Sequence, residues 1–393
     1  MDSKKLTQYG IKDPVSIMDA LYNIGQEAII NIVKTSAAPQ ERKQLRTWGI
    51  NAVASMIGKA PNTIRALETK NTIAEPFKDD NSRKQYSLEL INQIREATNI
   101  QFKRPKDKDP IILCVLNFKG GVGKSMTSLL LTQYLAIEGI KVLGIDLDPQ
   151  ATLTTWFGFI PDIDLLEDDT LATTLLEDEK DIKRVIKKTY FTGIDIIPAN
   201  LELQNVELNL PLLSDEKIQE IGSPLKRLKT ALNQVKSNYD VVVIDCPPNT
   251  GALTMNAVSA ANSVLITLPP SMPDFASFIR LTKTLKKVFS VANPNKLDFF
   301  RILLTKHKGN NAANKLDQLM RKLYGEFILV NHMIDSAEID NTSNALLSLY
   351  EKPYAVNSST YRRAIEACNK VNFEILEAFK EIWGITSFRN NHE

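Results

Sequence analysis

Residues 117–125 read Asn117-Phe118-Lys119-Gly120-Gly121-Val122-Gly123-Lys124-Ser125, after an apolar run at 111–116 and before a helix-compatible stretch, Met126–Ile137. A glycine-rich loop between a strand and a helix is typical of phosphate binding. The glycines let backbone N–H groups curl around phosphate oxygens, and the helix presents its N-terminal donors to the same anion. Lys124 would neutralise phosphate charge, and the Ser125 hydroxyl would ligate Mg²⁺. The loop therefore predicts a nucleotide site.

Two acidic motifs supply the remaining chemistry. Asp146-Leu147-Asp148-Pro149-Gln150 ends one apolar run, and Asp245 ends another and precedes Cys246-Pro247-Pro248. Transfer of a phosphoryl group to water needs charge neutralisation and a positioned water. We assign Asp146 and Asp245, with Ser125, to magnesium and Asp148 to the water. An aspartate at a strand end is otherwise a common turn former or helix cap, but three beside a phosphate loop favour catalysis.

The chain from Ile111 onward alternates short apolar runs with helix-length amphipathic stretches. The runs are IILCVL, KVLGID, DIIP, DVVVID, SVLIT and FRILLT. Runs without polar alternation are expected for parallel strands that are buried on both faces. The pattern predicts an α/β fold with a doubly wound, mostly parallel sheet. Binding sites in such sheets lie at the carboxyl ends of the strands, where the motifs above fall.

KGGVGKS, DLDPQ and VVVIDCPPNTG, in this order, resemble the ParA branch of the deviant Walker P-loop ATPases over about residues 111–393. Phe118 stands where the usual P-loop pattern has glycine, and Lys119 is the extra lysine of the deviant form. The resemblance implies an ATP-bound nucleotide-sandwich dimer, in which Lys119 reaches the facing subunit's nucleotide. It also implies sequence-blind DNA binding by that dimer and hydrolysis stimulated by a ParB-type partner.

The resemblance assigns site residues by position. By this resemblance, the catalytic residues would be Lys119, Lys124 and Asp148. Met126 stands where the family usually has threonine, so the hydroxyl contact to the nucleotide is expected to pass to Thr127. ATP or ADP would be bound by Lys119, Gly120, Gly121, Val122, Gly123, Lys124, Ser125, Met126 and Thr127. Arg362 and Arg363 are candidates for phosphate contacts with DNA, although a solvated helix face has the same appearance.

The chain is divided here into residues 1–40, 41–104, a linker at 105–110, and the ATPase at 111–393. Residues 1–110 hold 18 Lys+Arg and 13 Asp+Glu, a net +5, which leaves 48−18=30 against 46−13=33, or −3, for the rest. A basic N-terminal part permits nucleic-acid contact. The stretch Val15–Val33 has an apolar helical stripe, which either packs on its own domain or forms a dimer contact.

Residues 53–65 have the spacing of a helix-turn-helix. Gly58 permits the tight turn, Ile64 plugs the core, and Pro61 suits the first turn of the second helix. A plain helical hairpin is the alternative. The basic and aromatic stretch 83–91 resembles the wing of larger ParA proteins, which repress their own operon. We therefore expect an all-α winged helix-turn-helix domain whose DNA contacts are Lys59, Asn62, Thr63, Arg65, Arg83 and Lys84.

Other features narrow the class of protein. No run approaches the ~18 apolar residues of a membrane span, and the start lacks a secretory signal, so a cytoplasmic, nucleoid-associated protein is expected. Three dispersed cysteines and three isolated histidines suggest no metal cage. Two rival functions remain: a membrane-associated positioning ATPase of the MinD kind, and a nucleotide-sensing transcriptional regulator. The amphipathic stretch Phe373–Trp383 is interpreted as a packing helix, because its glutamates disfavour anionic lipid.

Overall fold

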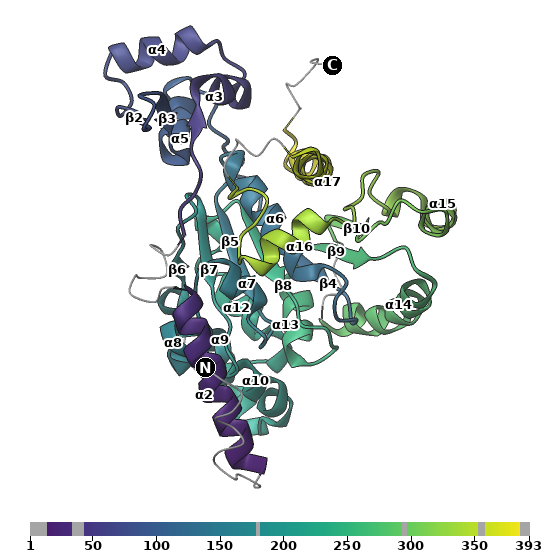
Figure 1. The fold of residues 1–393 in the computed structure, drawn as a ribbon. Helices are drawn as coiled ribbons and strands as arrows, with labels where there is room; N and C mark the ends of the chain where they lie inside the picture. The colour runs from purple at the N-terminus through teal and green to yellow at the C-terminus, as the bar shows by residue number, and fades with distance from the viewer. Residues whose placement is uncertain (1–13, 34–42, 178–180, 293–296, 353–357, 386–393) are drawn as a thin grey trace.

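A computed structural model describes residues 14–33, 43–177, 181–292, 297–352 and 358–385 (Figure 1). Its centre is a seven-stranded sheet in the order β10-β9-β4-β8-β5-β7-β6. All neighbouring strands run parallel except the short edge strand β6, which is antiparallel to β7. The strands are β4 (Ile111–Leu116), β5 (Val142–Asp146), β6 (Lys187–Lys188), β7 (Ile194–Ile197), β8 (Val241–Asp245), β9 (Ser263–Leu268) and β10 (Phe299–Leu304).

The central strands separate two hydrophobic cores. Along β4, Ile111, Leu113 and Val115 belong to one core, and Ile112, Cys114 and Leu116 belong to the other. Side chains of a strand alternate between faces, so an all-apolar strand must be covered on both. Helix α6 (Lys124–Ile137) and helix α17 (Ser359–Trp383) cover the first face, and α13 (Ala252–Ala260) and α14 (Met272–Ala292) cover the second. The predicted doubly wound sheet is confirmed.

The remaining helices surround this sheet (Figure 1). They are α7 (Thr152–Trp156), α8 (Pro161–Asp164), α9 (Leu171–Leu176), α10 (Leu203–Asn209), α11 (Asp215–Ile221), α12 (Arg227–Leu232), α15 (Asn311–Tyr324) and α16 (Ala337–Asn344). The C-terminal stretch lies in α17, where Ile375, Leu376, Phe379 and Trp383 are at most 1% exposed. Its interpretation as a packing helix is confirmed. None of the described helices is long and apolar enough to span a membrane.

The segment before the linker contains α3 (Ile50–Ile57), α4 (Pro61–Thr69) and α5 (Leu88–Ala97). The expectation of an all-α domain is wrong, because β1 (Trp48–Gly49), β2 (Phe77–Lys78) and β3 (Lys84–Tyr86) form a three-stranded antiparallel sheet. Strands of two or three residues are too short to show the alternation by which a strand is recognised. Of this sheet, β3 and the start of α5 lie in the stretch 83–91 in which the wing was expected, and β2 precedes it.

The turn between α3 and α4 has the predicted local chemistry. Gly58 caps α3 in the left-handed conformation, with φ 62°, and Pro61 is the first residue of α4. Ile64 of α4 is fully buried. A residue with a Cβ is strained at such a φ, so glycine is the residue that this turn favours. Two helices joined by a tight turn therefore lie where the sequence predicts them.

Contacts join this segment firmly to the sheet domain. The Arg95 guanidinium of α5 is 4% exposed and donates to the Ile137 carbonyl at the end of α6, at 2.6 Å. Lys43 forms an ion pair of 2.7 Å with Glu351, and both side chains are buried. The Trp383 indole donates to the Asp109 carbonyl at 3.1 Å. The predicted linker is thus anchored to α17 at its end.

Helix α2 (Pro14–Val33) lies apart from α3, beside α8 and α9 (Figure 1). Gln26 donates to Asp162 of α8 at 2.7 Å. Four large apolar side chains of α2 are between 47% and 67% exposed: Val15, Met18, Leu21 and Tyr22. Of the predicted stripe, Leu21 and Ala28 are exposed and Ile17 and Ile24 are half-buried. The rest of the fold therefore covers the stripe only in part, so packing on its own domain and a dimer contact both stay open as interpretations.

Candidate active site

The loop between β4 and α6 is held in shape by contacts at both ends. The Asn117 amide donates to the Thr267 carbonyl at 2.7 Å, and the Thr305 hydroxyl donates to the Val122 carbonyl at 2.8 Å. Gly121 and Gly123 have φ values of 72° and 88°, in the left-handed region that favours glycine. The loop is thereby shaped before any ligand arrives, with its N–H groups at the start of α6.

Lys124 is the first residue of α6 and is only 6% exposed. Its Nζ lies 3.3 Å from the Lys119 carbonyl, so the side chain folds back over the loop. Burial lowers the pKa of Lys124, and the nearby Asp245 and Asp148 carboxylates act against that shift. A cation held inside the loop is placed to meet the phosphate oxygens of a nucleotide.

Asp146 and Asp245 stand side by side at the ends of β5 and β8, where they are register partners. Both carboxylates are fully buried. Burial, together with the neighbouring Asp245 carboxylate, raises the pKa of Asp146 to about 8 against the hydrogen bonds from Thr154 and Asp148. Burial likewise raises the pKa of Asp245 to about 7, against the Ser125 hydroxyl and the Lys124 charge. A cation placed here would favour the charged carboxylates.

The two carboxylates differ in their hydrogen bonds. Asp146 accepts from the Thr154 N–H and hydroxyl, both at 2.8 Å, and from the Asp148 N–H at 3.1 Å. Asp245 Oδ1 lies 3.1 Å from the Ser128 hydroxyl, whereas Oδ2 has no hydrogen-bond partner among the described residues. An unsatisfied buried oxygen is unfavourable unless a ligand reaches it, so the free atom of Asp245 suits a hydrated magnesium ion.

A cavity of about 420 Å³ opens beside the loop and is lined by seven of the nine predicted nucleotide residues, whereas Lys119 and Val122 line a second cavity. The walls of the 420 Å³ cavity include Lys124, Ser125, Met126, Thr127 and Asp148. Neither Asp146 nor Asp245 is among the lining residues, because both lie beneath it. The fold thus places Asp148 at the surface of the cavity and the other two aspartates behind it.

The opposite wall of this cavity was not predicted from the sequence motifs. It is formed by residues that follow β10 and by the segment that enters α16, namely Thr305, Lys306, Met333, Ile334, Asp335, Ser336 and Ile339. The loop after β10 belongs at the carboxyl edge of the sheet, so the general rule for such sheets could have found Thr305 and Lys306. No feature of the sequence indicates that residues 333–339 line the same cavity.

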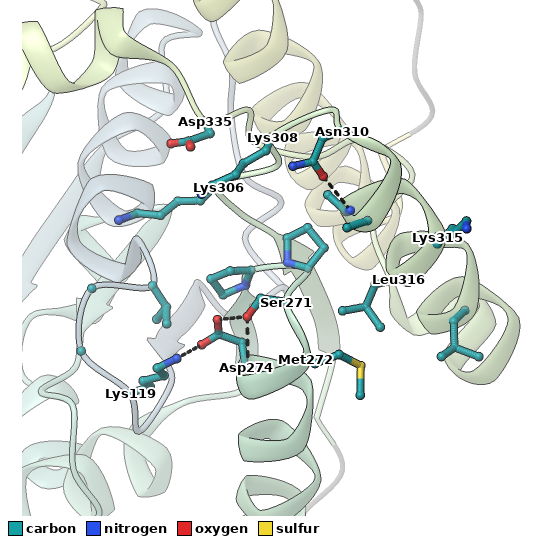
Figure 2. A pocket seen from close by; sticks show the side chains of 18 residues that line it. Lys119, Ser271, Met272, Asp274, Lys306, Lys308, Asn310, Lys315, Leu316 and Asp335 are labelled. Atoms are coloured by element: carbon teal, nitrogen blue, oxygen red, sulfur yellow. Dashed lines mark hydrogen bonds and ion pairs between the residues drawn. The ribbon is translucent and has the colours of Figure 1, made fainter.

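Lys119 faces a second cavity of about 860 Å³ on the other side of the loop (Figure 2). Its ammonium forms an ion pair with Asp274, whose carboxylate also bonds the Ser271 hydroxyl. Figure 2 shows Lys306 and Asp335 on the far side of the same cavity. In this single chain, the lysine expected to reach a facing subunit is therefore paired with a carboxylate of its own α14.

The predicted DNA contacts are all solvent-exposed but lie in separate parts of the fold. Lys59, Asn62, Thr63 and Arg65 surround the start of α4, where the Arg65 guanidinium donates to the Asn62 side chain at 2.6 Å. Arg83 and Lys84 lie at the β2–β3 hairpin, and Lys84 is paired with Glu68 of α4. Arg362 and Arg363 lie near the start of α17. The structure brings the α4 and hairpin residues into one domain.

The fold brings two of the supposedly isolated histidines together. The rings of His307 and His332 stack with centroids 4.1 Å apart, and Asp317 Oδ2 lies 3.4 Å from His307 Nε2. The ligand atoms of the three residues lie within 4.8 Å of one another. However, the Gly309 N–H donates to His307 Nδ1 at 3.1 Å, so the ring proton belongs on Nε2. Metal binding at Nε2 would require the opposite tautomer, which makes this cluster a poor cation site.

Comparison with known proteins places the sheet domain in a broad class. A family described as "AAA domain" matches residues 111–298. A protein of Sinorhizobium fredii called "Putative replication protein A" is 35% identical, over 88% of this chain and 89% of that protein. A protein of Myxococcus xanthus called "Chromosome partitioning protein ParA" is 31% identical, over 55% of this chain and 71% of that protein.

Solved structures show the same fold. A structure called "Partition Protein" superposes with a TM-score of 0.65 and 20% identity, covering 92% of this chain and 99% of its own. Cobyrinic acid a,c-diamide synthase from Mycobacterium smegmatis, with bound ATP analog and magnesium, gives a TM-score of 0.51 and 26% identity, over 62% of this chain and 91% of its own. The first of these likenesses extends beyond the sheet domain into the segment before the linker.

Proposed function

Because this chain belongs to the ParA family of plasmid and chromosome partition ATPases, we propose that it binds Mg-ATP in the cavity beside its phosphate loop and uses weak hydrolysis as a switch. The observation that carries the proposal is the arrangement around Asp245. A buried lysine and a helix N-terminus line the 420 Å³ cavity, and a fully buried carboxylate has an oxygen without a partner among the described residues. These are the groups that a triphosphate and its magnesium require.

Each group has a proposed role. Lys124 neutralises the phosphates, Ser125 and Asp245 hold magnesium with its water, and Asp148 orients the attacking water from the cavity wall. Magnesium, when bound, draws charge from the phosphate oxygens. The prediction that Asp146 also holds magnesium stays a prediction. Its three internal hydrogen bonds favour a supporting role, in which Asp146 sets the turn that carries Asp148.

We further propose an ATP-dependent homodimer. In it, Lys119 leaves Asp274 and reaches the nucleotide of the facing subunit. The ion pair with Asp274 is partly exposed, so exchanging it for a phosphate contact costs little. The exposed apolar side chains of α2 provide a second contact between copies. A ParB-type partner stimulates hydrolysis in this assembly.

The segment of α3, α4 and the β2–β3 hairpin is proposed to bind the operator of the protein's own operon and repress it. Asn62, Thr63 and Arg65 stand exposed at the start of the second helix, where side chains of such motifs meet base edges. Arg362 and Arg363 serve sequence-blind binding to the nucleoid from a different domain. The protein would accordingly act in the cytoplasm, associated with DNA.

The decisive experiment is a DNA-binding titration with the upstream region of the protein's own operon and a scrambled duplex of equal length. It is run without nucleotide, with ADP and with ATP. Asn62→Ala/Thr63→Ala is expected to lose preference for the operator while keeping ATP-dependent binding to scrambled DNA. Arg362→Ala/Arg363→Ala is expected to show the reverse. Lys70→Ala, exposed at the far end of α4, is the control. Binding indifferent to nucleotide on both duplexes would contradict the proposal.

A further inference from the structure

The loop between β8 and α13 contributes one residue to the proposed site. β8 ends at Asp245 and α13 begins at Ala252, so residues 246–251 must bridge the two. Within this loop, Pro248 lines the nucleotide cavity together with Asp148. The position at which α13 begins therefore determines where the loop can lie next to magnesium and the attacking water.

A carboxylate from another helix caps the start of α13. Glu207 of α10 precedes Ala252 by 45 residues, yet its Oε2 accepts the Ala252 N–H at 2.7 Å. Its Oε1 accepts the Leu253 N–H at 3.3 Å. The first N–H groups of a helix have no acceptor within the helix, and a negative charge there is also favoured by the helix dipole. The residue at the cap position, Gly251, has no side chain to do this itself.

Gly251 leaves room for this contact, which a larger residue would displace. Its φ of −74° and ψ of −170° are ordinary extended values, so the backbone alone does not require glycine. A Cβ at this position, however, would lie 1.8 Å from Glu207 Oε2 and 2.5 Å from its Cδ. Glycine at position 251 therefore allows the Glu207 carboxylate to approach the start of α13 closely.

We propose that Glu207 is a positioning residue for ATP hydrolysis: it fixes the start of α13 and thereby holds loop 246–251 against the nucleotide cavity. This inference rests on the proposed ATPase function. Glu207 touches neither nucleotide nor magnesium and acts through the loop. Because the phosphate loop and Lys124 lie on β4 and α6, losing Glu207 leaves ATP binding in place and impairs the chemical step.

The first test compares Glu207→Gln with wild type in steady-state ATP hydrolysis. Glutamine keeps the shape but loses the charge, and one of its two polar atoms is a donor facing an N–H. We expect kcat to fall by roughly tenfold or more, since small displacements around a reacting group are expensive, with little change in KM for ATP. Glu202→Gln is the matched control, because Glu202 immediately precedes the same helix and its side chain accepts from the exposed Asn205 at 2.7 Å, away from α13.

The second test is a double-substitution cycle on thermal unfolding. Gly251→Ala is expected to lower Tm in wild type, because the new methyl displaces the Glu207 carboxylate from the helix start, and hardly at all in Glu207→Ala, which lacks those atoms. An equal loss in both backgrounds overturns the contact. A lower Tm of Glu207→Gln with unchanged kcat overturns the positioning role. Wild-type protein that retains no ATP would overturn the proposed function instead, and the unfolding cycle would still report on the contact.

Discussion

At the scale of single residues, the phosphate loop depends on two glycines and one lysine whose roles can be separated. Gly123 has φ 88° and its missing Cβ would lie 3.6 Å from Thr305, whereas a Cβ on Gly120 meets nothing within 4 Å. The two positions therefore differ in backbone strain although they belong to the same loop. Lys124 contributes charge and little to the loop's shape.

Gly123→Ala is expected to destabilise the folded protein by about 1–2 kcal/mol, because an alanine at this φ is strained. The same change at Gly120 should alter the free energy of unfolding by less than about 0.5 kcal/mol. Denaturant unfolding without nucleotide measures both. Equal losses at the two positions would show that the left-handed conformation of Gly123 is not what stabilises the loop.

Lys124→Ala is expected to abolish the rise in Tm that Mg-ATP causes in wild type. Ligand at about 100 times its Kd stabilises a protein by roughly 2.7 kcal/mol, so the wild-type shift is measurable. The variant should fold normally without nucleotide, because removing a buried cation relieves its desolvation. Differential scanning fluorimetry with and without Mg-ATP checks this. Lys141→Ala, at an exposed lysine before β5, should retain the full shift.

At the scale of elements, the attachment of α5 to α6 decides whether the segment before the linker is a free module. Arg95 donates to the Ile137 carbonyl at the end of α6 and to Asn92 within α5, and its side chain is nearly fully buried. Cations at a helix C-terminus interact favourably with its dipole and its last carbonyls. The contact therefore fixes one helix of the N-terminal segment to the helix that begins at Lys124.

Arg95→Ala is expected to lower the free energy of unfolding by about 1.5–3 kcal/mol, the range for a hydrogen bond to a charged group. Limited proteolysis should then release the segment before residue 111 faster than in wild type. Lys70→Ala, exposed on α4, is the control for both measurements. An unchanged cleavage rate in Arg95→Ala would mean that other contacts alone hold the segment.

At the scale of the whole molecule, the ion pair of Lys119 bears on the proposed ATP-dependent dimer. Lys119 is bonded to Asp274 of its own chain and would have to leave it to reach a facing subunit. ATP offers the lysine a stronger anion across the interface, because a triphosphate with Mg²⁺ keeps net negative charge. Dimerisation should therefore follow ATP and be absent with no nucleotide, apart from any contact through α2.

Lys119→Ala is expected to bind ATP and remain at the nucleotide-free mass, because Lys124 and the loop N–H groups stay in place. Light scattering coupled to size exclusion, in Mg-ATP and in ADP, measures the mass of wild type and variant. Lys141→Ala should dimerise as wild type does. A variant that forms the same ATP-dependent dimer would show that Lys119 does not act between subunits.

The sequence by itself determined the sheet, because each buried parallel strand is a continuous apolar run that can be recognised locally. It also determined the phosphate loop, whose glycines and lysine are adjacent in the chain. Only the tertiary structure decided which aspartate keeps a free oxygen, what lines the far wall at 333–339, and which carboxylate approaches Gly251. These depend on contacts between segments tens to hundreds of residues apart, and local periodicity carries no information about such contacts. The short strands β1–β3 could not be predicted for a related reason. A strand of two or three residues is stabilised by neighbouring segments and shows no sequence pattern of its own.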